Sequence, residues 1–231
     1  IISEEKKQLP DSEIEKYKTE NNFVLWKSNG DLIRGIPKEK VPLSELVVWI
    51  DPLDATQEYT EDLVQYVTVM ACIVVKGRPK FGVIYRPFQN QAVWGLDGHG
   101  VFPKEQQLPN SEKITSKTVI VSRSHAGEVA KLVNSSLGTG YTVEPAGGSG
   151  YKTLRVLNGT AAVYVHNTYI KKWDLCAGDA IIRAAGGSMK TLQGDDLTYF
   201  PNDRDVVNKN GLLVALRNTF YYLAKLKPKT A

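Results

Sequence analysis

Two carboxylates, Asp51 and Asp54, stand three positions apart around Pro52, in the segment VVWIDPLDATQEYTE of residues 47–61. The apolar, β-branched run ahead of them predicts a buried strand. A carboxylate at the last position of a strand and another just past a proline-fixed turn can converge on one point beyond the sheet edge. Carboxylate oxygens are the ligands that hard cations such as Mg²⁺ prefer. The spacing therefore indicates divalent metal chemistry.

Ala55 and Thr56 follow directly, where the chain turns into a polar segment of helical character. Their backbone N–H groups and the threonine hydroxyl suit a phosphate group, so an anion-binding turn is predicted beside the metal ligands. A structural alternative stays open, because Asp-Pro-x-Asp is common turn chemistry and an Asp before a helix often serves as its N-cap.

Two further acidic segments lie far from this one in the chain. Glu4 and Glu5 stand upstream, and Trp173-Asp174 opens an apolar periodic run downstream. Taken alone, Asp174 reads as a helix N-cap, whose loss costs about 1 kcal/mol of stability. The variant Asp174→Asn separates the two interpretations, since the loss of a metal ligand abolishes turnover and the loss of a cap does not.

The three segments, Glu-Glu, D-P-L-D-A-T and W-D in this order, resemble the signature of the inositol monophosphatase superfamily, which comprises lithium-sensitive, magnesium-dependent phosphatases. The resemblance implies a mixed α/β fold, a layered αβαβα sandwich of the inositol monophosphatase and fructose bisphosphatase type. It implies roughly two or three Mg²⁺ ions, held by Glu4, Asp51, the Leu53 carbonyl, Asp54 and Asp174. Thr56 and Asp54 are then the catalytic residues, with Thr56 orienting the attacking water and Glu5 a partner behind the ligands.

Within the superfamily, the chain is most similar to the Golgi-type bisphosphate 3′-nucleotidases, which remove the 3′-phosphate of adenosine 3′,5′-bisphosphate. The similarity lies in S-R-S-H (122–125), P-A-G-G-S-G-Y-K (145–152) and Y-I-K-K-W-D (169–174), and in alanine rather than glycine at position 55. It implies a nucleotide site with a charge partner for the 5′-phosphate in Lys152. The implied substrate-binding residues are Asp54, Ala55, Thr56, Ser122, His125, Gly148, Lys152 and Asp174.

Each of these substrate residues also has an ordinary structural interpretation. Ser-Arg-Ser-His suits a strand end, a single histidine is more often structural than a ligand, and Gly147-Gly148 suits a turn. G-G-S-G-Y-K is not a Walker loop, because the spacing before the lysine and the residue after it do not fit.

Length and charge limit the classes of partner. The 231 residues, 42% of them hydrophobic, can bury a sizeable core. A net charge of +4 is compatible with a small anionic substrate and too weak and dispersed for a nucleic acid polymer. No apolar stretch approaches the length that crosses a bilayer, so membrane attachment is expected only through an N-terminal anchor that the resemblance implies and this sequence does not contain.

The cysteines and sequons bear on the compartment. Cys72 and Cys176 each sit in an apolar run, which predicts buried thiols rather than a disulfide and leaves the redox compartment undecided. Sequons at Asn134 and Asn158 suit a lumenal protein. The resemblance implies the Golgi lumen, with the cytoplasm as the alternative.

The chain starts at Ile1 with no signal-peptide pattern. The superfamily places helices, a hairpin and an Asp-containing loop ahead of the Glu-Glu pair. We therefore expect one phosphatase domain over residues 1–231 that lacks its N-terminal segment, with a metal-binding half at 1–117 and a substrate-binding half at 118–231.

Periodicity predicts how the elements alternate. Residues 13–45 read as loop or surface helix. Strands are predicted from Leu46, at 67–75 and 81–85 around a turn at 76–80, in a pair over 92–102, and at 118–121, 141–143 and 161–165. Helices are predicted at 126–137, 148–157 and 174–185, the last ended by Gly186-Gly187. This alternation indicates a layered α/β or α+β architecture.

Three functions are consistent with these patterns. The first is a Mg²⁺-dependent 3′-nucleotidase acting on adenosine 3′,5′-bisphosphate. The second is an inositol phosphate phosphatase with the same chemistry, which the S-R-S-H and G-Y-K segments disfavour. The third is an inactive member of the fold with a binding role, suggested by the missing N-terminal segment.

Overall fold

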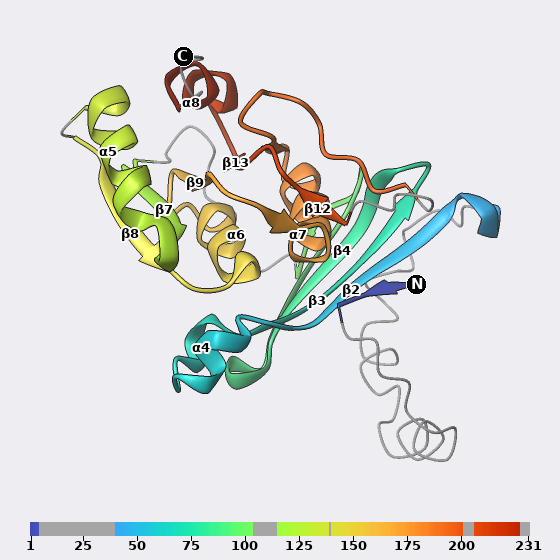
Figure 1. The fold of residues 1–231 in the computed structure, drawn as a ribbon. Helices are drawn as coiled ribbons and strands as arrows, with labels where there is room; N and C mark the ends of the chain where they lie inside the picture. The colour runs from blue at the N-terminus through green and yellow to red at the C-terminus, as the bar shows by residue number, and fades with distance from the viewer. Residues whose placement is uncertain (5–39, 104–114, 139, 201–205, 227–231) are drawn as a thin grey trace.

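A computed structural model of the chain describes residues 1–4, 40–103, 115–138, 140–200 and 206–226. The larger of its two main sheets has six strands in chain order (Figure 1). The first two strands pair in parallel and the others pair antiparallel, so the sheet is largely a meander. The strands are β1 (Ile2–Ser3), β2 (Leu46–Asp54), β3 (Thr68–Val75), β4 (Arg78–Arg86), β5 (Gln91–Leu96) and β6 (Gly100–Phe102).

The smaller main sheet has five strands in the order β11-β13-β9-β7-β8. Strand β7 is parallel to both of its neighbours, whereas β13 is antiparallel to β9 and to β11. A separate antiparallel pair joins β10 to β12. The bounds are β7 (Thr118–Ser122), β8 (Thr142–Ala146), β9 (Val163–His166), β10 (Ile170–Lys171), β11 (Ser188–Lys190), β12 (Val207–Asn208) and β13 (Leu212–Ala215).

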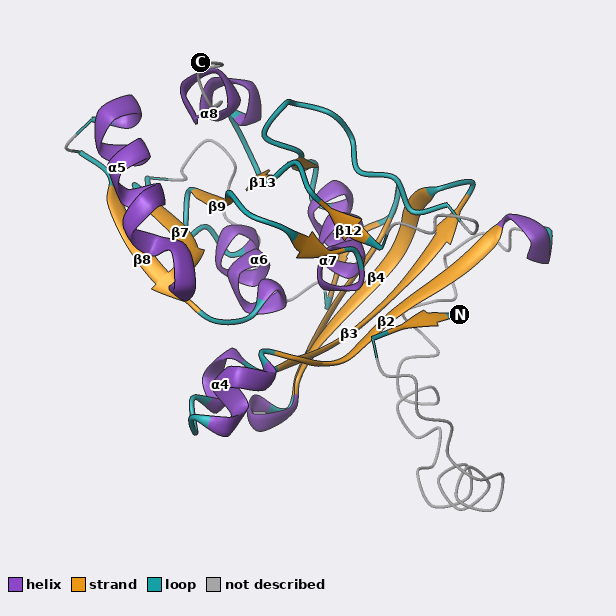
Figure 2. Ribbon diagram, viewed as in Figure 1, coloured by secondary structure: helices purple, strands orange, loops and turns teal. Residues whose placement is uncertain are grey.

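The helices fill one layer between the main sheets and another outside the smaller sheet. Helix α7 (Trp173–Ala184) packs on β2–β5, and α6 (Ser149–Leu157) lies between α7 and the smaller sheet (Figure 2). Helices α5 (Ala126–Leu137) and α8 (Thr219–Leu226) cover the outer face of the smaller sheet. Sheet, helices, sheet and helices thus follow one another, and the predicted layered fold is confirmed.

Short helices complete the described chain. Helix α4 (Thr56–Thr60) follows β2 directly and belongs to the site described below. The 3₁₀ helices are η1 (Leu43–Glu45), η2 (Val64–Tyr66), η3 (Pro87–Gln89) and η5 (Arg123–His125). Within the described ranges, no helix is both long and apolar enough to cross a membrane.

Alternation along the strands of the smaller sheet divides the core in two. Val119 and Val163 face the outer helices and join the core around α5 and α8. The next residues along, Ile120 and Tyr164, belong to the core that contains α6 and α7. Because successive side chains of a strand point to opposite faces, Tyr164 is directed into the layer between the sheets.

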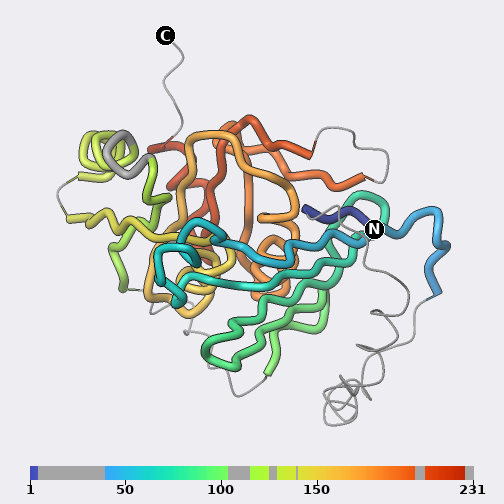
Figure 3. Tube along the Cα trace, turned by 60° about the horizontal axis from the view of Figure 1, so that its bottom comes forward, coloured from blue at the N-terminus to red at the C-terminus, as the bar shows by residue number. Residues whose placement is uncertain are grey.

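Two glycines let α7 approach the larger sheet closely. Gly82 on β4 pairs with Gly95 on β5. A Cβ atom at position 82 would clash with the Ala177 carbonyl, and one at position 95 would lie 2.8 Å from the Ile181 Cα. The helix backbone therefore rests against the strand backbone, where no larger residue fits. Figure 3 shows these strands side by side in chain order.

The hairpin after β3 is tighter than predicted. The expected turn at 76–80 reduces to Lys76 and Gly77, whose φ angles of 52° and 76° suit a two-residue turn of type I′. Strand β4 already starts at Arg78, and a register shift between Ile73 and Val74 accommodates Pro79, which cannot donate to the ladder.

In the second half, the helix at 126–137 is confirmed. Strand β8 is longer than predicted and runs through Pro145, which is tolerated because β8 lies at the sheet edge. Strands β11 and β13 and helix α8 have no counterpart among the predictions. The prediction for 13–45 falls outside the described residues up to position 39.

The prediction of free thiols is wrong. Cys72 and Cys176 form a disulfide, with Cα atoms 5.7 Å apart. Cys72 lies on the face of β3 that α7 covers, and Cys176 lies on the face of α7 that meets it, so the two apolar runs bring the sulfurs together. Sequence periodicity shows that each cysteine is buried but not that their two faces meet.

Candidate active site

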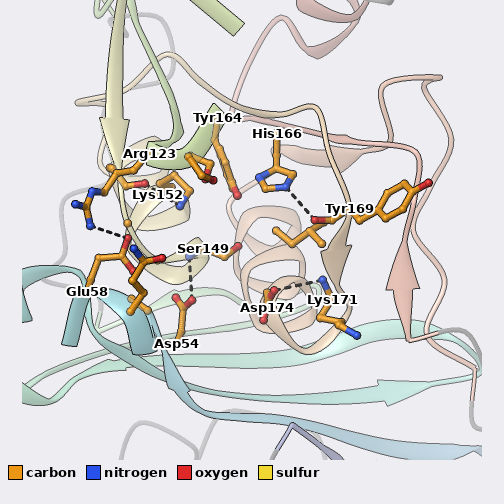
Figure 4. A pocket seen from close by; sticks show the side chains of 18 of the residues that line it. Asp54, Glu58, Arg123, Ser149, Lys152, Tyr164, His166, Tyr169, Lys171 and Asp174 are labelled. Atoms are coloured by element: carbon orange, nitrogen blue, oxygen red, sulfur yellow. Dashed lines mark hydrogen bonds and ion pairs between the residues drawn. The ribbon is translucent and has the colours of Figure 1, made fainter. Parts of the chain in front are cut away.

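A pocket of about 560 Å³ opens where the ends of several elements meet. It lies between the end of β2 with α4, the end of β7 with η5, the start of α6, and the segment from β9 to the start of α7 (Figure 4). In the view of Figure 4, Asp54 and Asp174 point into it from below and Tyr164 points into it from above. The lining residues are Asp54, Ala55, Gln57, Glu58, Ser122, Arg123, Ser124, Ala146, Gly147, Gly148, Ser149, Lys152, Tyr164, His166, Tyr169, Ile170, Lys171, Asp174 and Val207.

A β-bulge in β2 buries both carboxylates of the D-P-L-D segment. Asp51 pairs with Met70 and Asp54 pairs with Thr68, so three steps along β2 match two steps along β3. In a regular strand, residues three apart point to opposite faces, whereas the extra residue of the bulge restores one face to both. Asp51 is 1% exposed and Asp54 is 7% exposed.

Asp54 ties the end of β2 to the start of α6. Its Oδ1 accepts a hydrogen bond from the Ser149 N–H at 3.1 Å, and its Oδ2 accepts from the Gly150 N–H at 2.8 Å. The Thr68 hydroxyl also donates to Oδ2, at 2.9 Å. Asp51 is more lightly bound, since its Oδ1 accepts from the Leu53 N–H at 3.1 Å. Asp54 therefore has a structural role beside any chemical one.

Asp174 is not the N-cap that its sequence context allowed. Helix α7 starts at Trp173 and its N-cap residue is Lys172, so Asp174 lies in the first turn. Its Oδ2 accepts a hydrogen bond from the Lys171 N–H at 3.3 Å. A carboxylate in the first turn is favoured by the helix dipole, and here it also faces Asp51 and Asp54.

The three aspartates repel one another in a poorly solvated place. Burial, followed by the charges of Asp54, Asp174 and Glu4, raises the pKa of Asp51 to about 9. Burial, followed by Asp54 and Glu4, raises the pKa of Asp174 to about 8. Burial also raises the pKa of Asp54, against Lys152 and the amide donors of α6. Such a cluster lacks positive charge, which is what a bound cation supplies.

The donor set fits a hard divalent cation in its chemistry. Carboxylates and a backbone carbonyl are the oxygen ligands that Mg²⁺ takes. Within the described ranges, however, no three Asp, Glu, His or Cys side chains converge closely enough to hold an ion in the orientations that they adopt.

The remaining predicted ligands and the anion-binding turn lie at the same strand end. Glu4 is exposed, and its N–H donates to the Ile50 carbonyl at 3.3 Å, which places it beside the end of β2. The Leu53 carbonyl accepts the Thr56 hydroxyl at 2.9 Å. Ala55 adopts the left-handed conformation, with φ of 71°, at the N-cap of α4. Glu5 falls outside the described residues.

The predicted substrate residues are partly brought together. Ser122 and Gly148 line the pocket, and the Ser122 hydroxyl lies 3.0 Å from that of Ser124. Gly148, with φ of 62°, is the N-cap of α6, and a Cβ atom there would lie 2.5 Å from the Tyr66 carbonyl. His125 is the last residue of η5, and its side chain is not among those described.

Lys152 is a buried cation at the pocket wall. It is 4% exposed, its Nζ donates to the Ala146 carbonyl at 3.2 Å, and it lies 5.2 Å from the centre of the Tyr164 ring. Burial lowers the pKa of Lys152 to about 8, although Asp54, Glu58 and Asp174 favour its charged form. This position suits a lysine that receives an anion.

Sequence reasoning missed several lining residues. Arg123 donates to Glu58 at 3.1 Å and pairs with Glu61 at 2.7 Å, and so joins η5 to α4 across the pocket. Of these three, Arg123 and Glu58 line the pocket. They lie within or beside the quoted S-R-S-H and D-P-L-D-A-T segments, and this proximity could have identified them. Ser149 likewise lies within the quoted P-A-G-G-S-G-Y-K segment, whereas Tyr164 gave no signal, since it lies in an apolar strand.

The sequence matches the inositol monophosphatase family over residues 1–226. The chain belongs to this family. The family's members are phosphatases that hydrolyse phosphoric monoesters and depend on magnesium. The aspartate cluster described above comes from the D-P-L-D-A-T and W-D segments on which the resemblance to the family was based.

Two groups of curated family members are similar over most of the chain. Inositol monophosphatase 3 of Danio rerio is 47% identical over 198 residues, 82% of this chain and 56% of that protein. The Golgi-resident adenosine 3′,5′-bisphosphate 3′-phosphatase of Homo sapiens is 41% identical over 219 residues, 90% of this chain and 59% of that protein. The chain thus spans less than two thirds of the length of these relatives.

Solved structures of family members share the fold. CysQ from Bacteroides thetaiotaomicron superposes with a TM-score of 0.64 at 24% identity, covering 80% of this chain and 76% of that one. An IMPase/NADP phosphatase complexed with Mg²⁺ and phosphate superposes with a TM-score of 0.65 at 16% identity, covering 90% of this chain and 80% of that one.

Proposed function

We propose that the protein is a Mg²⁺-dependent phosphatase that removes the 3′-phosphate of adenosine 3′,5′-bisphosphate, giving AMP and inorganic phosphate. The observation that carries the proposal is the cluster of Asp51 and Asp54, both buried, with the half-buried Asp174, beside a pocket that also holds Lys152. The carboxylates at one end of the site would bind cations, and the lysine at the other end would bind an anion. A substrate with two phosphates suits this polarity.

Glu4, Asp51, the Leu53 carbonyl, Asp54 and Asp174 are the proposed ligands of roughly two or three Mg²⁺ ions. When bound, the ions lower the pKa of an attacking water and neutralise charge on the phosphoryl oxygens. The family's magnesium dependence and the raised pKa values of Asp51 and Asp174 support this assignment.

Thr56 is proposed to orient the attacking water. Its hydroxyl proton is committed to the Leu53 carbonyl at 2.9 Å, so its lone pairs are left to accept a hydrogen bond from a water molecule. The water oxygen then forms a bond to phosphorus as the bond from phosphorus to the 3′-oxygen breaks, and a proton released by the water ends on the 3′-oxygen, which becomes the 3′-hydroxyl of AMP. An aligned water in a fixed position lowers the entropic part of the barrier.

The second phosphate is proposed to bind near Lys152. A lysine that is almost fully buried and donates a hydrogen bond to a carbonyl retains further donors for a phosphate oxygen. Ser122, Gly148 and His125 complete the proposed nucleotide site, with Ala55, Thr56, Asp54 and Asp174 around the phosphate that is removed.

An inositol phosphate phosphatase is the second candidate. The observation that favours it is the 47% identity to a relative named inositol monophosphatase 3. The nucleotide is preferred because the relatives named as adenosine 3′,5′-bisphosphate phosphatases cover more of this chain, and because Lys152 offers a place for a second phosphate that an inositol monophosphate lacks.

The proposed location is the Golgi lumen. The Cys72–Cys176 disulfide suits an oxidising compartment of the secretory pathway and argues against the cytoplasm. The Golgi-resident relative supports the same location. Asn134 and Asn158 of the two sequons are both exposed.

Phosphate release tests the proposed function. The full chain is incubated with adenosine 3′,5′-bisphosphate, inositol 1-phosphate or no substrate, with Mg²⁺ or with EDTA. We expect release from the nucleotide that requires Mg²⁺ and is lost in Asp51→Asn, with the exposed Asp195→Asn as the matched control. Release from inositol 1-phosphate alone would favour the second candidate, and no release from either would favour an inactive fold member with a binding role.

A further inference from the structure

Two hydroxyl groups in the pocket wall lack hydrogen-bond partners. Tyr164 is 0% exposed and Ser149 is 5% exposed, and both line the pocket. Among the described residues, neither side-chain oxygen meets a hydrogen-bond partner in good geometry, although the Ser149 hydroxyl lies close enough to Tyr164 to offset part of the rise that burial causes in its pKa. Figure 4 shows the two oxygens pointing toward one another and into the pocket. Leaving buried hydroxyls unpaired is costly, so the pair calls for a ligand.

A third buried hydroxyl, that of Thr153, serves as a comparison because it is unpaired but lies away from the pocket. Thr153 lies one turn along α6 from Ser149, is equally buried and is also unpaired, but does not line the pocket. Tyr164 differs because strand alternation directs it into the layer where the pocket opens. Ser149 differs because it is the first residue of α6, where the pocket begins.

The phosphate that is removed already has its place in the proposed site, against α4 and the proposed metal ligands, so the two hydroxyls are left to a neighbouring group of the substrate. Burial raises the pKa of Tyr164, as do the charges of Asp54 and Asp174, so the phenol keeps its proton and can donate. Lys152 lies against the Tyr164 ring, 5.2 Å from its centre. A neutral group that both donates and accepts suits two hydroxyls best.

The position of Ser149 places the pair of hydroxyls beside the carboxylate cluster. Its backbone N–H donates to Asp54 at 3.1 Å, so its hydroxyl belongs to a residue that already contacts the carboxylate cluster. A ligand atom between Ser149 and Tyr164 therefore lies next to the phosphate ester and not at the far end of the substrate.

We propose that Tyr164 and Ser149 bind the hydroxyl group that neighbours the phosphate ester of the substrate. In adenosine 3′,5′-bisphosphate this is the ribose 2′-hydroxyl, and in an inositol phosphate it is the adjacent ring hydroxyl. The proposal rests on the proposed function only in that the substrate is a phosphate monoester. Both residues are specificity determinants that distinguish a substrate with this hydroxyl from its deoxy analogue.

Steady-state kinetics with a matched pair of substrates tests the proposal. The pair is adenosine 3′,5′-bisphosphate and 2′-deoxyadenosine 3′,5′-bisphosphate, and the variants are Tyr164→Phe, Ser149→Ala and the control Thr153→Val. We expect wild type and Thr153→Val to prefer the ribonucleotide, and the first two variants to lose about 10-fold to 100-fold in kcat/KM on it. Their kcat/KM on the deoxynucleotide should change little, because the lost partner is absent there.

A second measurement separates folding from recognition. Tyr164→Phe keeps the ring that packs against Lys152 and removes an unpaired buried hydroxyl, so its melting temperature without ligand should equal or exceed that of wild type. Equal losses on both nucleotides, or a wild type that does not distinguish them, would overturn the proposal.

Failure of the nucleotide assignment is distinguishable from failure of this subsite. If inositol 1-phosphate is the substrate that releases phosphate, the same variants are compared on it and on the analogue without the adjacent hydroxyl. If no substrate turns over, calorimetric titration with the two nucleotides replaces kinetics. A preference that survives Tyr164→Phe in either format overturns the subsite, whichever substrate class is correct.

Discussion

The Cys72–Cys176 disulfide closes a loop of 104 positions between β3 and α7. We predict that replacing both cysteines by alanine lowers the free energy of unfolding by about 2 to 5 kcal/mol. The chain-entropy model gives about 4.7 kcal/mol for a loop of this length, and native disulfides reach the lower figure when the unfolded state is already compact. Loss of each buried sulfur adds roughly 0.8 kcal/mol, as for a methylene.

The single variants make the test specific. Cys72→Ala alone already removes the disulfide. Adding Cys176→Ala should therefore lower the free energy of unfolding only by the packing contribution of one sulfur. If the two cysteines were not bonded, each single substitution would lower the free energy of unfolding only through lost packing, and the two losses would add. The double variant would then equal the sum of the single ones instead of nearly equalling either.

The assay is equilibrium unfolding in urea without reductant, followed by tryptophan fluorescence. Reductant should lower the unfolding midpoint of the wild type and leave that of the double variant unchanged. Alkylation of the unfolded, unreduced wild type should label no thiol. The reasoning fails if two thiols are labelled, or if the double variant unfolds within about 1 kcal/mol of the wild type, which is an ordinary substitution cost.

Three further predictions follow from the site and its surroundings. Asp174→Asn should lower the rate of phosphate release by more than about 100-fold and stability by no more than about 1 kcal/mol, as measured by phosphate release and urea unfolding; a variant with wild-type turnover would contradict the metal assignment. The pKa of Asp179 is raised from 3.8 to about 6 by burial, against its partner Arg183, so its contribution to stability is present below pH 3.8 and lost as the pH rises through 6. The free energy of unfolding of the wild type relative to Asp179→Asn should therefore fall between pH 4 and pH 7, and a pH-independent difference would contradict this. Ala55→Gly should raise the free energy of unfolding and the melting temperature, since a left-handed alanine costs about 1 kcal/mol or more and glycine does not. The control Ala130→Gly in the middle of α5 should lower the free energy of unfolding by about 1 kcal/mol, and equal signs for the two variants would refute the conformational argument.

Elements with a clear period were predictable from sequence. The helix at 126–137 shows apolar spacing throughout and forms with those bounds. The strand up to Asp51 was predictable from its β-branched run, but the turn expected at Pro52 is wrong, because β2 continues to Asp54 through a bulge. The bulge was not predictable, because it depends on pairing with Thr68 and Met70 on another strand. Periodicity describes one element, whereas a bulge is a property of two.

Properties that require knowing which faces meet were beyond the sequence. The disulfide is one case, and the Tyr164 hydroxyl is another. Tyr164 stands in a buried apolar strand and reads as core, and only the position of the strand beside α6 shows that its oxygen reaches the pocket. Asp51 and Asp54 were singled out locally, as two carboxylates at a strand end, whereas Glu4 and Asp174 were singled out only through the resemblance to the family. The roles of the predicted ligands and of the two halves of the chain stay predictions.

Gly82 and Gly95 influence the candidate active site although they do not line its pocket. They set how deeply α7 rests on the strands, and α7 carries Asp174. A methyl group at either position would lift the helix and draw one acidic side chain away from the others without altering any of them. A natural variant with alanine at position 82 or 95 should therefore be grouped with inactivating lesions, although a survey limited to pocket residues would score it as harmless.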